Sequence, residues 1–259
     1  MILEYKGANI FYTDQGKGAA VVLLHGFLEN STMWDDFVVE TSKNQRVICI
    51  DLLGHGQTEC LGYVHTMDDM SDAVEAVLNH LKIRRSIFIG HSMGGYVALV
   101  FAEHFPDNVK GLCLLNSTTR VDSEERKKLR SRAILAAKRE YKSLVRMSIS
   151  NLFRPKNRVV FKEEINHVKK EALKTPLQGY IAAQEGMKLR EDREVLLHFS
   201  PYKKMFVIGK KDPILNYEEL IEQTSNSEVE VVELSGGHMS HIENKEPLFA
   251  ALKKFIKSC

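Results

Sequence analysis

The chain carries Gly90-His91-Ser92-Met93-Gly94-Gly95 between an apolar run, Ser86–Ile89, and a helical pattern, Gly94–His104. A G-x-S-x-G motif in this setting predicts a sharp strand-to-helix turn that presents its serine. The two glycines leave room for the close approach of the strand and the helix. The Ser92 hydroxyl would project at the helix N-terminus, where the helix dipole favours a developing oxyanion. The motif therefore predicts that Ser92 is a nucleophile.

Strand and helix patterns alternate along most of the chain. Short apolar runs indicate buried strands at Ile10–Thr13, Ala19–Leu24, Arg46–Ile50, Ser86–Ile89, Val109–Leu115, Met205–Ile208 and Glu228–Leu234. Between them, apolar residues spaced three and four apart predict helices, for example over Asp68–Leu81 and Phe249–Ile256. This alternation predicts βαβ units, and hence an α/β fold with a mostly parallel sheet and helices on both faces.

The middle of the chain breaks this alternation. Residues 121–198 contain helical patterns such as Ser123–Tyr141 and no convincing strand. They hold 19 Lys and Arg against 11 Asp and Glu, a net charge of +8, whereas the rest of the chain has a net charge of −6. We interpret them as a helical insertion that covers one end of the sheet. Its basic residues form either a solvated helical face or part of a binding cleft.

A serine nucleophile needs a base, and the base needs an orienting acid. Asp212 follows the predicted strand Met205–Ile208, and His238 follows the predicted strand Glu228–Leu234 after a pair of glycines. Both residues lie at the carboxyl ends of strands, the edge where open α/β sheets place their active sites. We predict that His238 activates Ser92 and that Asp212 orients His238.

Both partners of the serine have alternative interpretations. Asp212 precedes Pro213, so a turn or helix-capping role is the alternative for its side chain. His241 is a rival base, but it lies deeper in the segment after the strand, and we expect a surface or helix-capping role for it. A metal site on His238 and His241 would lack further ligands at a useful spacing.

A third functional motif, after those of the serine and of its acid and base, is His25-Gly26-Phe27, which follows the apolar run Val21–Leu24. Acyl transfer needs fixed hydrogen-bond donors aimed at the developing oxyanion. We assign this role to the backbone N–H groups of Phe27 and Met93, and expect the Phe27 side chain to line the acyl pocket. Structural roles in loops and packing are expected for the neighbouring residues His25, Trp34, Asp51, His55 and His91.

Five motifs stand at the predicted strand ends: H-G-F at 25–27, D-L-L-G-H-G at 51–56, G-H-S-M-G-G at 90–95, G-K-K-D at 209–212 and G-G-H-M-S-H-I-E at 236–243. Together they resemble the α/β-hydrolase superfamily, and within it the small esterase-like members. The resemblance implies the α/β-hydrolase fold: an eight-stranded, mostly parallel sheet flanked by helices, with a helical cap after the sixth strand. It implies a core over residues 1–120 and 199–259, a cap over 121–198, the triad Ser92, Asp212 and His238, and no cofactor or metal.

The expected activity is hydrolysis of carboxylic esters of small molecules through an acyl-enzyme. Similar motifs occur in lactonases, thioesterases, carbon–carbon bond hydrolases and cofactor-free haloperoxidases, so these activities stay open, as does a non-enzymatic ligand receptor. A serine nucleophile departs from epoxide hydrolases and haloalkane dehalogenases, which need a carboxylate there. Some hydrolases of this fold place their acid after the strand Val109–Leu115, which makes Asp122 the alternative to Asp212.

The composition indicates which binding partners and which cellular compartment to expect for the protein. Hydrophobic residues make up 44% and charged residues 27% of the 259 residues, as in globular proteins. The net charge of +2 gives no general attraction to nucleic acid, and no run approaches the ~20 apolar residues of a membrane helix. With no recognisable signal peptide and four widely spaced cysteines, we expect a cytoplasmic protein with free thiols. We expect it to be a monomer or a homodimer.

Overall fold

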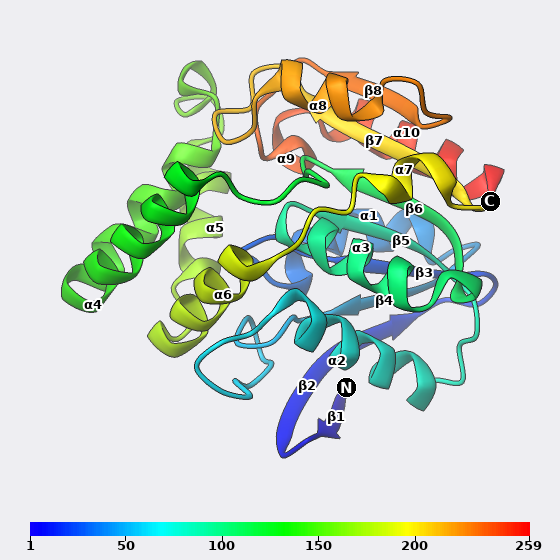
Figure 1. Ribbon diagram of the computed structural model, residues 1–259, viewed down its shortest axis with the longest axis horizontal. Coiled ribbons are helices and arrows are strands. Elements are labelled where there is room, and N and C mark those ends of the chain that lie inside the picture. Colours follow the sequence, from blue (N-terminus) through cyan, green and yellow to red (C-terminus); the bar gives the residue numbers. More distant parts are fainter.

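The computed structural model describes residues 1–259 and builds them around one eight-stranded sheet (Figure 1). The strands are β1 (Ile2–Tyr5), β2 (Ala8–Gln15), β3 (Ala20–Leu24), β4 (Arg46–Ile50), β5 (Ser86–His91), β6 (Val109–Leu115), β7 (Lys203–Gly209) and β8 (Glu230–Leu234). Their order across the sheet is β1-β2-β4-β3-β5-β6-β7-β8. β2 pairs antiparallel with β1 and β4, and all other neighbours are parallel. The expected fold class is confirmed.

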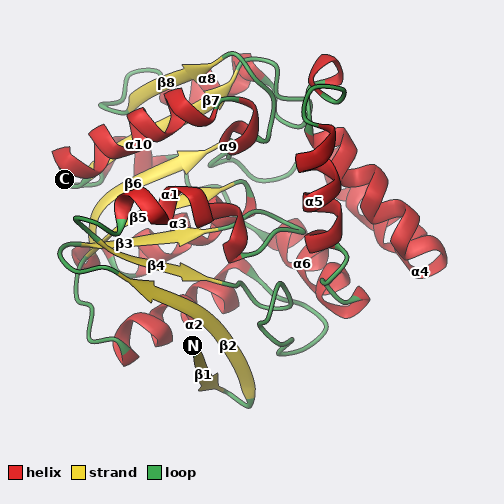
Figure 2. Cartoon of the chain, turned by 180° about the vertical axis from the view of Figure 1, so that it is seen from behind, coloured by secondary structure: helices red, strands yellow, loops and turns green.

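Helices cover both faces of the sheet (Figures 1 and 2). On one face, α2 (Met67–His80), α3 (Met93–His104) and α8 (Tyr217–Thr224) pack on alternate strand residues such as Val22 and Leu24. On the other face, α1 (Asp35–Thr41) and α10 (Lys245–Ser258) pack on the intervening residues, such as Val21 and Leu23. β3 and β5 are buried along their whole lengths. This two-sided burial explains why these strands are continuous apolar runs.

A local signal in the sequence explains where α2 begins. Thr66 accepts a hydrogen bond from the Asp69 N–H, and the Asp69 carboxylate accepts one from the Thr66 N–H, so a capping box starts α2. β1 was not expected from the sequence. It is the outer strand of an edge hairpin, so its residues alternate between exposed and half-buried. It therefore lacks the continuous apolar run by which the other strands were predicted.

Four helices lie between β6 and β7: α4 (Glu124–Leu152), α5 (Lys162–Ala172), α6 (Leu177–Leu189) and the short α7 (Val195–Phe199). α4 projects from the body of the molecule (Figure 1) and departs from helical geometry once, at Glu140. The residues facing inward from α4, α5 and α6 form a third hydrophobic cluster with Leu28 and Met239 of the core loops. No helix of the chain combines the length and the apolar character needed to cross a membrane.

A buried ion cluster joins the start of this helical segment to the end of α6 and packs against α3. Asp122, in the loop after β6, accepts hydrogen bonds from Arg130 on α4 and lies 2.7 Å from an Arg190 amino group at the end of α6. The Arg190 guanidinium also stacks 4.2 Å from the ring centre of Tyr96 on α3. Burial disfavours the Asp122 carboxylate, but the two guanidinium groups outweigh burial, so the pKa of Asp122 is lowered.

We predict that Asp122→Ala lowers the free energy of unfolding by about 3–5 kcal/mol, because it leaves the buried guanidinium of Arg190 and the half-buried guanidinium of Arg130 without their anion. Urea unfolding at neutral pH measures the loss. Because its folded pKa is lowered, Asp122 stabilises the protein above about pH 4, the ordinary range of an aspartate, and this contribution is lost as the pH falls through the folded pKa.

The control is Asp107→Ala, which removes an exposed carboxylate that makes no ion pair. That variant should change the unfolding free energy by less than about 0.5 kcal/mol. A loss of the same small size in Asp122→Ala would contradict the anchoring role of the cluster.

Candidate active site

Ser92 occupies a strained turn between β5 and α3. Its backbone has φ +48° and ψ −113°, a region that residues with a Cβ rarely adopt. A Cβ on Gly90 would lie 2.4 Å from the Gly94 carbonyl oxygen, and one on Gly94 would lie 2.5 Å from the Leu24 carbonyl oxygen. The turn is held by a 2.9 Å hydrogen bond from the Ser92 N–H to the carbonyl of Leu115 on β6. The tight approach predicted from the motif is therefore present.

The structure brings Ser92, His238 and Asp212 together. His238 Nε2 lies 3.0 Å from Ser92 Oγ, and His238 Nδ1 lies 2.8 Å from Asp212 Oδ2. Ser92 follows β5, Asp212 follows β7 and His238 follows β8, so all three come from the carboxyl ends of parallel strands. The arrangement can move the serine proton to the imidazole while the carboxylate faces the opposite ring nitrogen.

Asp212 is held as an anion by a set of donors. Burial disfavours its charged form, but His238, the backbone N–H of Ile214 and the Asn116 amide together outweigh burial, so the pKa of Asp212 is lowered. Its Oδ1 accepts from the N–H groups of Ile214 at 2.8 Å and Leu215 at 3.1 Å. The Asn116 amide donates to Oδ2 at 3.1 Å. These bonds fix the side chain that orients His238.

Ser92 and His238 open into a cavity of about 450 Å³ beneath the helical segment. The Phe27 side chain lines it, as expected, together with α4 residues that include Arg126, Arg130 and Ile149. The Phe27 N–H makes no hydrogen bond within the chain. Met93 is the first residue of α3, where an N–H has no partner inside the helix. Both groups assigned to the oxyanion are thus free to donate to a ligand.

A second buried network lies behind the histidine. His91 Nδ1 pairs with Glu29 Oε2 at 2.6 Å, and His91 Nε2 donates to the His238 carbonyl at 3.0 Å. Burial disfavours the protonated ring, but the Glu29 carboxylate outweighs burial and raises the pKa of His91. His91 therefore supports the loop that carries His238. His25 does the same for its own loop, because its Nε2 accepts from the Leu52 N–H at 2.9 Å.

Comparison with known proteins identifies the family of the chain. The sequence pattern of the alpha/beta hydrolase fold matches residues 19–141. A solved thermophilic esterase from Thermogutta terrifontis, described as malate bound, is 30% identical, with a TM-score of 0.91 and coverage of 97% of this chain and 94% of that one. The chain belongs to the α/β-hydrolase fold family.

Other relatives of this hydrolase-fold protein differ in their sequence identity to it and in the length that aligns. The 3-oxoadipate enol-lactonase 2 of Acinetobacter baylyi is 24% identical over 246 residues, which are 94% of this chain and 90% of the lactonase. An uncharacterized protein of Mycobacterium tuberculosis is 36% identical over 102 residues, so the chain matches 30% of that protein's length. The names of the esterase and the lactonase agree with the expected class, a hydrolase of ester bonds.

The structure places the alternative acid, Asp122, and the rival base, His241, away from Ser92. Asp122, the alternative acid, is bound by Arg130 and Arg190 and makes no contact with His238. His241, the rival base, does not face Ser92. It was expected at the surface or as a helix cap, which is wrong, because the ring is buried with 8% exposure on the short helix α9 (Ser240–Glu243).

Three supporting residues were not predicted. Asn116 bonds Asp212, Ser117 Oγ donates to the Ser92 carbonyl at 2.8 Å, and Glu29 pairs with His91. Asn116 and Ser117 directly follow β6, so the same strand-end argument that selected Asp212 and His238 could have found them. Glu29 also lies in the loop after β3, but no motif links it to His91, which the fold alone brings to it.

We predict that a serine-directed sulfonyl fluoride adds its mass to Ser92 alone, because only this hydroxyl is hydrogen-bonded to an imidazole. Ser148 is the internal control, since it lines the same cavity from α4 without a base. His238→Ala should slow labelling by at least ~10²-fold, the usual contribution of a general base. Peptide mass mapping measures both. Equal labelling of Ser148, or unchanged labelling in His238→Ala, would remove Ser92 from the nucleophile role.

Proposed function

We propose that this protein is a serine hydrolase that cleaves carboxylic esters of small molecules through an acyl-enzyme intermediate. The supporting observation is the chain of contacts from Ser92 Oγ through His238 to Asp212 at the mouth of a cavity. The full-length similarity to an esterase supports the same conclusion. In this proposal, residues 121–198 act as a cap that closes the cavity over the serine.

The first half of the reaction forms the acyl-enzyme. His238 Nε2 accepts the Ser92 proton as Oγ attacks the ester carbonyl, and Asp212 stabilises the resulting imidazolium. The carbonyl oxygen becomes an oxyanion that accepts hydrogen bonds from the N–H groups of Phe27 and Met93. Collapse of the tetrahedral intermediate breaks the bond to the alcohol, which takes the proton from His238 and leaves.

The second half releases the acid. A water molecule attacks the acyl carbon and gives its proton to His238, and the same two N–H groups bind the second oxyanion. Collapse then expels Ser92 Oγ, which recovers the proton from the imidazole. The reaction consumes one ester and one water and needs no group beyond those of the chain.

We predict that the protein hydrolyses p-nitrophenyl acetate or butyrate, and that Ser92→Ala lowers kcat by at least ~10³-fold. Asp212→Asn should lower kcat by about 10³–10⁴-fold, because the amide favours the wrong imidazole tautomer. Release of p-nitrophenolate measures both. The comparison variant is Asp122→Asn, assayed at a temperature where it is folded. A larger loss in that variant than in Asp212→Asn would assign the acid to Asp122.

Hydrolysis of lactones is the second candidate function. A lactone is an internal ester, so the same two steps open it, with the alcohol remaining attached to the acid. The supporting observation is the alignment with an enol-lactonase over nearly the full length of both chains. A panel of simple lactones assayed beside the p-nitrophenyl esters decides between the two, since a lactonase should favour the lactones in kcat/KM.

A positively charged side chain lines the cavity, where it would lie close to a bound substrate. Among the basic residues of the cap, Arg126 and Arg130 line the cavity, and Arg130 is neutralised by Asp122. The Arg126 guanidinium donates to the Ile214 carbonyl at 3.0 Å and stays 4.0 Å from Asp122. Arg126 is therefore the group that would attract a carboxylate on a substrate. Malate, bound by the similar esterase, is such a carboxylate.

We predict a preference of about 2–5-fold in kcat/KM for the p-nitrophenyl monoester of succinate over p-nitrophenyl butyrate at low salt, the size expected of one partly exposed charge pair. The preference should shrink as salt rises, because exposed charges are screened. Arg126→Gln should abolish it. Arg132→Gln, which removes an exposed arginine of the same helix outside the cavity, should leave it unchanged. Equal salt dependence for both esters would mean that the basic residues act only as a solvated face.

A further inference from the structure

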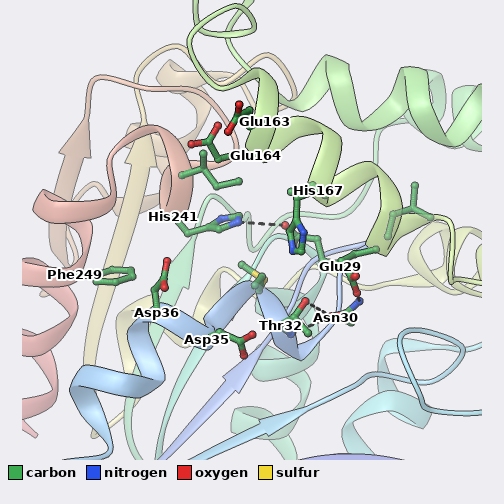
Figure 3. A pocket seen from close by; sticks show the side chains of 15 residues that line it. Glu29, Asn30, Thr32, Asp35, Asp36, Glu163, Glu164, His167, His241 and Phe249 are labelled. Carbon is green, nitrogen blue, oxygen red and sulfur yellow. Dashed lines mark hydrogen bonds and ion pairs between the residues drawn. The ribbon is translucent and has the colours of Figure 1, made fainter.

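A second cavity of about 480 Å³ lies on the other side of the loop that carries Phe27, between α1 and α5 (Figure 3). Six carboxylates line it, and no Lys or Arg does: Glu29, Asp35, Asp36, Glu163, Glu164 and Glu171. Figure 3 shows Glu163 and Glu164 on one side of this acidic pocket and Asp35 and Asp36 on the opposite side. Such a concentration of negative charge is unexpected beside a segment with a net charge of +8.

Half of these carboxylates lack a counterion within the chain. Glu29 pairs with His91, Asp36 with Lys245 and Glu171 with Lys174. The other three, Asp35, Glu163 and Glu164, make neither an ion pair nor a side-chain hydrogen bond. Burial, followed by the charges of Asp36 and Glu171, raises the pKa of Asp35 even though His167 acts against the shift. These three carboxylates are exposed and lie in the first turns of α1 and α5, so the helix N-termini and solvent, rather than a basic side chain, balance their charge.

The back of the acidic pocket carries buried polar atoms without partners. His241 is 8% exposed, and its Nδ1 has no hydrogen-bond partner. Its Nε2 points toward Glu29 Oε1 across 3.9 Å, too far for a hydrogen bond, and that oxygen has no donor either (Figure 3). Burial lowers the pKa of His241 to about 4, so its ring is neutral at neutral pH and can accept a hydrogen bond. Unpaired buried acceptors favour a ligand that brings N–H donors.

The shape of the pocket distinguishes an organic cation from a metal ion. No three of its carboxylate and imidazole groups lie close enough to hold one metal ion. Apolar side chains, among them Leu28, Ile242 and Phe249, lie between the acidic sides. A chain of methylene groups with ammonium groups along it matches both features, because the ammonium groups reach separate carboxylates and the methylenes contact the apolar surface.

We propose that the acidic pocket is a binding site for an aliphatic polyamine, held by Asp35 on α1, by Glu163 and Glu164 on α5 and by the buried pair Glu29 and His241. The site is separate from the cavity that Ser92 and His238 line, although Leu28 and Glu29 line both. Because α1 belongs to the sheet domain and α5 to the cap, the bound polyamine would link the two across the pocket.

Titration calorimetry of the whole protein with spermidine tests the proposal. We expect one site per chain, and a rise in Tm of about 3–6 °C at a spermidine concentration ten times Kd. Glu163→Gln combined with Glu164→Gln should raise Kd by at least ~10-fold, and Asp35→Asn on the opposite side should also weaken binding. Unliganded Tm values show that the variants are folded.

The matched control is Glu218→Gln combined with Glu219→Gln, which removes two exposed carboxylates from the first turn of α8, outside the acidic pocket. It should leave Kd within twofold of the original protein. Equal weakening by this control, or no saturable binding of spermidine, would overturn the proposal. Tighter binding of Mg²⁺ that displaces spermidine would also overturn it, because it would show a site for a single ion.

Discussion

The close approach of β5 and α3 at Ser92 is the constraint on which the rest of the molecule depends. The backbone of this serine is strained, and glycines two positions away on either side permit it. Such strain persists only where the surroundings hold the turn in place. Here the Ser92 N–H is bonded to β6 and its carbonyl to Ser117, so the neighbouring strand keeps the turn from relaxing. The serine hydroxyl is consequently fixed before any partner reaches it.

The parallel register of the sheet places the other polar groups around this fixed point. Strands β5, β6, β7 and β8 lie side by side and end at the same edge. Ser92, Asn116, Asp212 and His238 each follow one of these strands, so their spacing in the sequence has no bearing on their distance in space. Buried donors and ion pairs then set each side chain, as the Asn116 amide does for Asp212.

Much of the fold and of the candidate site could be predicted from the sequence, because the signals are local. A buried central strand is an apolar run, and the turn at Ser92 has its own motif. Contacts that the fold alone creates gave no such signal. Glu29 and His91 are 62 residues apart, and the burial of His241 depends on how α9 packs against the loop that carries Glu29. The acidic pocket joins α1 and α5, whose residues are more than 100 positions apart.

The order of the strands along the chain also sets when Ser92, Asp212 and His238 can meet. The turn at Ser92 is complete once β6 is in place, because its backbone bond reaches only to Leu115. Asp212 and His238 arrive with β7 and β8, which add to the outer edge of the sheet after the long helical segment. Because a domain generally folds as a unit, a sheet that lacked these two strands would leave the Ser92 hydroxyl without the His238 imidazole. The contacts among Ser92, His238 and Asp212 therefore form only when the last two strands have docked.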